Sequence, residues 1–244
     1  MIRFENYIRV KTVKEAYERN QSFQNVVGGG MMWLHLSEGE YDTLIDLCDL
    51  GLDQIEEEET YLKIGAMTTL SQLENSERIK EYFGSTFEDC LKHIVGVQFR
   101  NSATIGGSIV ARLGFSDIIT LLLPLETQLR FYSQGQISLQ DYLSGKNQRD
   151  ILEYILIPKK KKTIRFESIR RTYTDTAVLN VCGTKEEDGY RFAVGARPGV
   201  AILVKEDEEV LFGDNQRGSK EYRKHVYEIL KKRIKESLEE ETCG

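Results

Sequence analysis

Two glycine-rich stretches hold the residues of this 244-residue chain that point most plainly to chemistry. The first, VVGGGMM, spans residues 26–32, and the second, ATIGGSIV, spans residues 103–110. Successive glycines let another group approach the main chain closely, and consecutive backbone amides form a positively polarised nest that binds anions. Each stretch taken singly is more often only a structural turn. Two such stretches in one domain suggest a pair of anion nests, suited to the two phosphates of a dinucleotide.

Polar side chains beside the second stretch extend this pattern. The hydroxyls of Ser102, Thr104 and Ser108 offer hydrogen-bond donors to an anion. The Asp117 carboxylate is an acceptor suited to ribose hydroxyls, the role that acidic residues play in other dinucleotide sites. Ser116 and Asp117 also precede an apolar run, where either residue caps a helix N-terminus. The residues themselves leave both interpretations open.

Neither stretch is a familiar phosphate loop. The P-loop pattern GxxxxGK[ST] is absent, which argues against kinase or GTPase chemistry. The dinucleotide fingerprint GxGxxG also fails, because Met31, Met32 and Trp33 follow Gly30. An independent NAD- or ATP-dependent enzyme is therefore a weakly supported alternative.

Metal-binding residues are too dispersed to predict a protein-built metal site. The four cysteines, Cys48, Cys90, Cys182 and Cys243, contain no CxxC pair for zinc or an iron–sulfur cluster, and the three histidines are scattered. Cys182 lies in an apolar run and is expected to be a small core residue. Any redox chemistry is therefore expected to come from an organic cofactor.

Composition narrows the class of protein. The net charge of −6 argues against nucleic-acid binding, which needs a basic face. No apolar run approaches the roughly 18 residues that span a membrane. The first 20 residues contain no apolar core of a signal peptide. A cytoplasmic location without nucleic-acid or membrane partners is expected.

The elements around the glycine stretches can be predicted from capping signals and periodicity. Thr12 and Glu15 fit a capping box at a helix start. Strands are expected at residues 23–27, 43–47 and 61–67, with the acidic run 56–59 at a hairpin tip. Further helices are expected from residues 69 and 85, the latter running through Leu91 and Ile94.

A second region is expected after Pro158. The four lysines 159–162 are typical of a solvated linker. Strands are predicted at residues 163–169, 177–182, 190–196 and 200–205, followed by a helix over residues 220–239. The apolar residues of that helix recur at helical spacing: Tyr222, Val226, Ile229, Leu230, Ile234 and Leu238. The pattern predicts an α+β chain that ends in a small sheet with one helix packed on it.

The block FRNSATIGGSIV, followed nine residues after Ser108 by Asp117, closely resembles the FAD-binding (medium) subunits of molybdenum hydroxylases. These are the flavoprotein subunits of xanthine dehydrogenase and carbon monoxide dehydrogenase, with a PCMH-type FAD-binding fold. The order VVGGG, IGAMTTL, RNSATIGG, SD and ILIP also matches that family. The resemblance implies a two-part FAD-binding domain over residues 1–158, with sub-parts of about 1–55 and 56–158. A C-terminal flavoprotein domain would then cover residues 163–244.

The resemblance also implies which residues hold FAD. The first loop would cradle the pyrophosphate and adenosine side through main-chain amides: Asn25, Val26, Val27, Gly28, Gly29, Gly30, Met31 and Met32. The second phosphate contact would come from Thr104, Ile105, Gly106, Gly107 and Ser108, with Ile105 near the flavin ring. Asp117 would hold a ribose hydroxyl, Leu152 would lie near the adenine, and Ile94 falls where some relatives place an aromatic residue.

Two positions depart from the family pattern. Ser108 stands where the family usually has asparagine, and Glu167 aligns with a lysine near the flavin. Glu167 places an anion beside a ring that becomes anionic on reduction, so the usual flavin environment is altered or Arg165, Arg170 or Arg171 supplies the missing charge.

The family resemblance implies an electron-transfer role as an oxidoreductase subunit. Substrate would be hydroxylated at a molybdopterin cofactor on one partner subunit, and electrons would cross 2Fe-2S clusters on another to reach FAD. FAD would pass them to NAD or another acceptor, so no proton-transfer catalytic residue is expected in this chain. The alternative is a flavin-less scaffold or assembly subunit of the same kind of complex.

Overall fold

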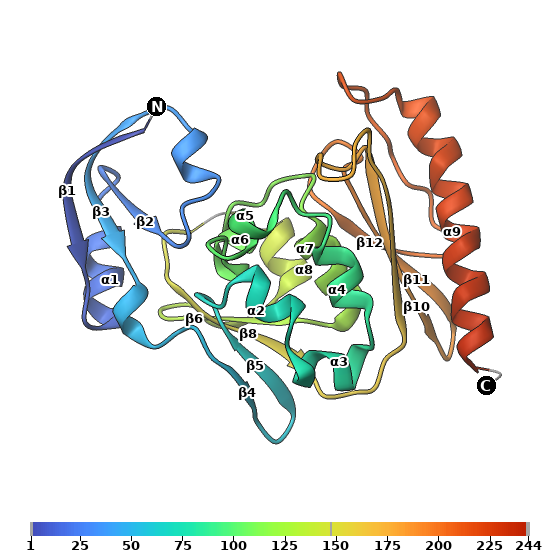
Figure 1. Ribbon diagram of the computed structural model, residues 1–244, viewed down its shortest axis with the longest axis horizontal. Coiled ribbons are helices and arrows are strands. Elements are labelled where there is room, and N and C mark those ends of the chain that lie inside the picture. Colours follow the sequence, from blue (N-terminus) through green and yellow to red (C-terminus); the bar gives the residue numbers. More distant parts are fainter. Residues whose placement is uncertain (1, 147, 243–244) are drawn as a thin grey trace. The chain divides into compact units, whose positions relative to one another are not determined.

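The structure is a computed structural model that describes residues 2–146 and 148–242. It confirms the predicted α+β class (Figure 1). Its residues group into two compact units that interleave along the sequence. Unit 1 comprises Met1–Gln72, Gln98–Ala111 and Thr127–Pro158, and unit 2 comprises Leu73–Val97, Arg112–Glu126 and Lys159–Gly244. The units do not follow a single cut at residue 158. The domains 1–158 and 163–244, and the sub-parts 1–55 and 56–158, stay a prediction.

Unit 1 contains a parallel sheet in the order β1-β3-β2. Its elements are β1 (Arg3–Arg9), α1 (Val13–Asn20), β2 (Asn25–Gly28) and β3 (Glu40–Asp46). Thr12 caps α1 as predicted, because its Oγ1 accepts from the Glu15 amide, while Glu15 Oε2 accepts from the amide of Lys11, one residue before the cap. The strand predicted from Phe23 begins only at Asn25. Phe23 is 82% exposed, so the apolar pattern extended too far.

An antiparallel five-stranded sheet completes unit 1, in the order β4-β5-β8-β6-β7. The strands are β4 (Ile55–Glu57), β5 (Tyr61–Gly65), β6 (Gln128–Phe131), β7 (Gly135–Ser138) and β8 (Leu152–Pro158). The β4–β5 hairpin turns at the acidic run, as predicted. Short helices accompany the sheets: α6 (Ile105–Val110) and α8 (Leu139–Ser144), with 3-10 turns at Leu34–Leu36 and Cys48–Leu50. Helices α2 (Leu70–Glu74) and α5 (Val97–Arg100) each have residues in both units.

Unit 2 is built on an antiparallel sheet in the order β12-β11-β10-β9. Its elements are α3 (Glu77–Phe83), α4 (Thr86–Leu91), α7 (Asp117–Leu122), a 3-10 turn at Leu123–Leu125, β9 (Ile164–Ile169), β10 (Leu179–Glu186), β11 (Gly189–Gly195), β12 (Ile202–Lys205) and α9 (Lys220–Thr242). Leu179 and Val181 of β10 pack with α9. The alternate residues, Asn180 and Cys182, bond to α7. Helix α9 therefore covers one face of the sheet and α7 the other (Figure 1).

The sheet and long helix predicted after Pro158 are confirmed, but the buried face of α9 is narrower than the sequence pattern predicted. Val226, Tyr227, Leu230, Ile234 and Leu238 are buried against the sheet. Tyr222 and Ile229, which the sequence assigned to that face, are 47% and 39% exposed. They lie at the side of the buried stripe, because 3.6 residues per turn rotate them away from it.

Candidate functional site

The first glycine stretch forms the end of an edge strand and the loop that follows. β2 pairs only with β3, through Asn25 to Gly28, and the chain then leaves the sheet. Met31 has a φ of 58°, in the left-handed region. In the part of the chain that the structure describes, the amides of Gly29, Gly30 and Met31 donate to no other group of the chain. This loop is half-buried and has the free donors that anion binding requires.

The second glycine stretch is a capped helix start rather than an open nest. Thr104 is the N-cap of α6, and its Oγ1 accepts from the Gly107 amide at 3.1 Å. The Ile105 and Gly106 amides donate to the carbonyls of Thr68 and Ala66. The Ser108 amide and hydroxyl both donate to the Thr104 carbonyl. The interpretation of residues 104–108 as a second nest of free amides is therefore wrong, because each of these donors already has a partner in the chain.

The structure brings the two stretches into direct contact. A Cβ on Gly30 would overlap the Ser102 carbonyl and approach the Ala103 Cα at 3.0 Å. A Cβ on Gly29 would lie 2.8 Å from Thr104 Oγ1. The backbone of Ser102 and Ala103 thus approaches Gly30, and the Thr104 side chain approaches Gly29. The two stretches form one surface within unit 1, and glycine is needed there for protein packing.

The segment IGAMTTLSQLE, residues 64–74, packs against the second glycine stretch. A Cβ on Gly106 would lie 2.6 Å from the Ala66 carbonyl oxygen. Thr69 Oγ1 accepts from the Gln72 amide, and Gln72 Oε1 accepts from the Thr69 amide, which is the helix start predicted there. Leu152, predicted near an adenine, is a buried residue at the start of β8 opposite Phe131. It lies in unit 1 with both glycine stretches.

Asp117 is the centre of a buried polar cluster in unit 2. Its Oδ2 lies 2.7 Å from Arg170 Nη2, and both side chains are 7% exposed. Its Oδ1 accepts from Asn180 Nδ2 at 2.7 Å. Burial raises the pKa of Asp117, while Arg170 and Asn180 act in the opposite direction. Ser116 is the N-cap of α7, so the capping interpretation holds for Ser116, whereas Asp117 anchors α7 to the sheet.

Glu167 lies on the opposite face of the sheet from Asp117. On β9, Arg165 donates to Ser237 of α9, and burial raises the pKa of Glu167 against the effect of Arg233 of the same helix. Arg170, five residues beyond Arg165, faces Asp117 and α7. The structure does not bring Glu167 and Asp117 together. Their predicted roles beside the flavin and the ribose stay predictions, as does that of Ile94, which follows α4 in unit 2.

The candidates for a compensating cation are each bound elsewhere in the chain. Arg170 pairs with Asp117. Arg165 donates to Ser237, and Arg171 donates to the carbonyls of Gln216 and Arg217. Their guanidinium groups stabilise unit 2.

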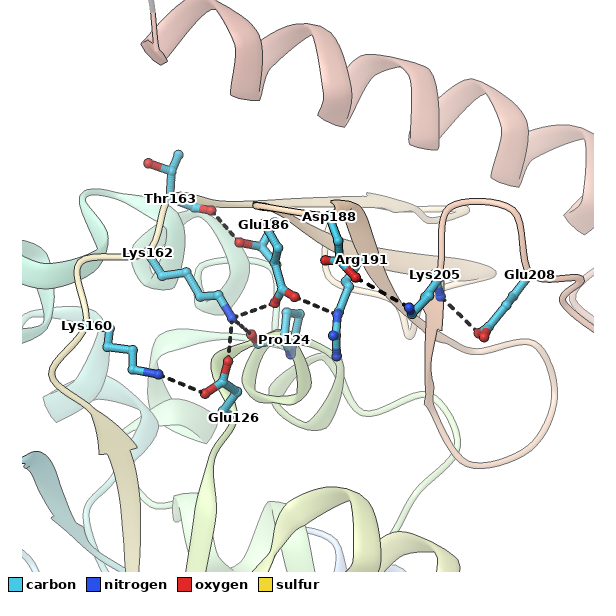
Figure 2. Close-up of polar contacts among 11 residues, drawn as sticks. Pro124, Glu126, Lys160, Lys162, Thr163, Glu186, Asp188, Arg191, Lys205 and Glu208 are labelled. Carbon is cyan, nitrogen blue, oxygen red and sulfur yellow. Dashed lines mark hydrogen bonds and ion pairs between the residues drawn. The ribbon is translucent and has the colours of Figure 1, made fainter.

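The lysine run is not uniformly a solvated linker, as Figure 2 shows. Lys162 is only 16% exposed, and its Nζ donates to the Pro124 carbonyl at 3.0 Å, to Glu126 at 3.1 Å and to Glu186 at 2.8 Å. These contacts use all three ammonium protons. Glu186 also pairs with Arg191 at 2.6 Å. The prediction was wrong for Lys162, because its partners are distant in sequence.

Among the described residues, no group of three or more His, Cys, Asp and Glu side chains could hold a metal ion. Cys182 is fully buried, as predicted, and burial raises the pKa of its thiol. Cys243 lies outside the described residues. No helix in residues 2–146 and 148–242 is both long and apolar enough to cross a membrane.

Known proteins share sequence with most of this chain. The family described as "FAD binding domain in molybdopterin dehydrogenase" matches residues 2–160. The chain is 27% identical over 210 residues to the uncharacterized protein YgfM of Escherichia coli (strain K12), covering 84% of this chain and 79% of YgfM. It is 23% identical over 205 residues to the nicotine 6-hydroxylase medium subunit of Paenarthrobacter nicotinovorans, covering 77% and 72%.

Solved structures share the fold over almost the whole chain. A chain of carbon monoxide dehydrogenase from Hydrogenophaga pseudoflava superposes with a TM-score of 0.84 at 20% identity, covering 97% of both chains. A chain of quinoline 2-oxidoreductase from Pseudomonas putida 86 gives 0.83 at 18% identity, covering 95% of both. At these identities the likeness establishes the fold.

Proposed function

Since the chain belongs to the family of FAD-binding domains of molybdopterin dehydrogenases, we propose that it is the FAD-binding electron-transfer subunit of a heteromeric molybdenum hydroxylase. It would receive electrons from an iron–sulfur subunit, itself supplied by a molybdopterin-binding subunit, and pass them to NAD or another acceptor. The similarity to a nicotine 6-hydroxylase medium subunit supports a role as one subunit of several. A xanthine dehydrogenase-like substrate range rests on the sequence resemblance alone.

The donor set of the first loop fits the pyrophosphate of FAD. The amides of Gly29, Gly30 and Met31 have no partner among the described residues, so a phosphate can accept from them without displacing a bond of the fold. Asn25 Oδ1 is buried without a hydrogen-bond partner at the start of β2, and as an acceptor it suits a hydroxyl or amino donor of the adenosine part rather than a phosphate. This unused hydrogen-bonding capacity beside a fixed backbone carries the proposal, because buried polar groups are normally paired.

The other predicted contact residues differ in how many further hydrogen bonds they can make. The Thr104 hydroxyl accepts one hydrogen bond and keeps its proton for donation. The Asp117 carboxylate, in unit 2, is 7% exposed and already held by Arg170 and Asn180, so its proposed role at a ribose hydroxyl rests on the sequence resemblance alone. FAD when bound supplies the redox chemistry, while the residues of this chain bind and orient it.

Titration of the apoprotein with dinucleotides tests this proposal. FAD is expected to bind with one-to-one stoichiometry in calorimetry, and the complex should show the absorption bands of oxidised flavin. FMN is expected to bind more weakly, because it lacks the second phosphate and the adenosine that the first loop would hold. Binding of NAD or ATP instead of FAD would contradict the proposal and favour an independent nucleotide-dependent enzyme.

A flavin-less scaffold subunit is the second candidate. The observation that favours it is the saturation of the second stretch, where the amides of Ile105, Gly106, Gly107 and Ser108 are all engaged. In the sequence resemblance Glu167 stands in place of a lysine near the flavin, and this replacement also favours the flavin-less candidate. Isolation of the complex from its source distinguishes the two: stable association with iron–sulfur and molybdopterin subunits without flavin would establish the scaffold.

A further inference from the structure

Arg149 joins two segments that lie more than 120 residues apart in the chain. Its Nε donates to the Asn20 carbonyl at 2.5 Å, and its Nη2 donates to the carbonyls of Ser22 and Asn25, both at 2.8 Å. Nη2 also lies 3.0 Å from Asn20 Oδ1. A single guanidinium therefore serves four acceptors between the end of α1 and the start of β2.

Side chains at the end of α1 also donate hydrogen bonds to the backbone of the Arg149 segment. Gln21 Nε2 donates to the Arg149 carbonyl at 3.1 Å, and Asn20 Nδ2 donates to the Asp150 carbonyl at 3.3 Å. The Arg149 guanidinium also lies 5.0 Å from the ring centroid of Phe23. This cation–π contact gives the Phe23 ring a partner at the surface, where the residue is 82% exposed.

The position of the junction relates it to the first glycine loop. The Asn20 carbonyl lies at the C-terminus of α1, where a cation is favoured by the helix dipole. The Asn25 carbonyl belongs to the first residue of β2, a four-residue edge strand with one neighbour. A strand this short depends on what holds its ends.

Both ends of the segment that carries the free amides are therefore fixed by other parts of unit 1. Arg149 holds Asn25 at the start of β2, and after it the Thr104 side chain packs on Gly29 and the backbone of residues 102–103 on Gly30. We infer that Arg149 is a positioning residue for the cofactor loop: it sets the path of residues 20–28 and so orients the amides of Gly29 to Met31 before a ligand arrives. Such preorganisation raises affinity because less ordering is left for the binding step.

Lysine cannot replace Arg149 in this role. An ammonium is a compact charge on a flexible stem, whereas the planar guanidinium directs donors toward separate acceptors. Arg149→Lys is therefore expected to retain the charge but leave some of the Asn20, Ser22 and Asn25 carbonyls without this donor. Arg149→Ala removes both the charge and the donors.

Hydrogen exchange of the apoprotein tests the inference without any cofactor. In Arg149→Ala, peptides covering residues 20–32 should exchange about tenfold faster than in the wild type, whereas β5 and β8 should be unchanged. Arg149→Lys should show an intermediate change and decides the matter if the alanine variant does not fold. Arg9→Ala is the matched control, because Arg9 lies on the same sheet but pairs with Cys48 and Asp49.

The functional arm measures the FAD dissociation constant, which should rise about tenfold in Arg149→Ala and remain at the wild-type value in Arg9→Ala. Unchanged exchange in residues 20–32, or equal acceleration throughout the protein, would overturn the positioning role. This arm rests on the proposed function. A wild-type protein that binds no FAD would refute that function, while the exchange measurement would still decide what Arg149 does.

Discussion

Substitution of Gly30 by alanine tests the contact between the two glycine stretches most directly. The added Cβ would fall well inside 3.0 Å of the Ser102 carbonyl, a separation that real Cβ atoms essentially never show. The obstacle is backbone, which cannot rotate away as a side chain can. Overpacking costs about 1–3 kcal/mol, and the rigid neighbour places Gly30→Ala near the upper end of that range. At about 2–4 °C per kcal/mol for a chain of this size, the melting temperature should fall by roughly 6–12 °C.

Gly28→Ala is the matched control in the same glycine stretch. Its Cβ would meet Leu44 Cδ1 at 2.8 Å and Met31 Sδ at 3.2 Å, which are ends of flexible side chains. Its cost should be about 1 kcal/mol or less, because these atoms can shift. Urea unfolding and thermal melts of both apoproteins measure the difference. Equal stability of the two variants would refute the reasoning that Ser102 is what requires a glycine at position 30.

Two further substitutions, Lys162→Met with its control Lys160→Met and His93→Gln, test unit 2. Lys162→Met should lower the free energy of unfolding by about 2–3 kcal/mol, since it leaves Glu186 with one cation fewer in a half-buried site. The side chain of Lys160 is 75% exposed, so Lys160→Met should change the free energy of unfolding by less than about 0.5 kcal/mol. Similar losses from both variants in urea unfolding would contradict this. Burial and nearby Arg170 lower the pKa of His93 in the folded state. The unfolded chain therefore binds more protons below about pH 6.5, and stability falls as the pH falls through that range. In His93→Gln this part of the pH dependence should vanish, and an unchanged slope between about pH 5 and 6.5 would show that His93 does not cause it.

Local signals in the sequence predict much of the fold. The capping pair of Thr12 and Glu15 lies within four residues, and the structure contains the hydrogen bond from the Glu15 amide to Thr12 Oγ1. The short apolar runs after Pro158 likewise predict the four-stranded sheet, in which β10 is buried on both faces. The exposed Phe23 and the wider apolar face assigned to α9 were misjudged. Hydrophobicity alone does not say which neighbour, such as Arg149, holds a side chain at the surface.

The candidate site is less accessible to such reasoning, because its decisive contacts are long-range. Nothing near Arg149 or Lys162 indicates that their charges are satisfied by residues tens of positions away. The free amides were expected in both glycine stretches, yet only tertiary structure assigns the carbonyls of Ala66 and Thr68 as partners of the second. Glycine content shows where a backbone can be approached, and it does not identify the approaching group.

The first loop combines two demands that a glycine can meet at once. Gly30 needs the absence of a Cβ toward Ser102, while its amide donates to no other group among the described residues. Packing on one side of the backbone thus fixes the direction in which the amides present their protons. Loss of FAD affinity in a glycine variant would therefore not by itself show that the glycine touches the cofactor. The stability of the apoprotein separates these causes, because a packing defect lowers it without ligand and a lost ligand contact leaves it unchanged.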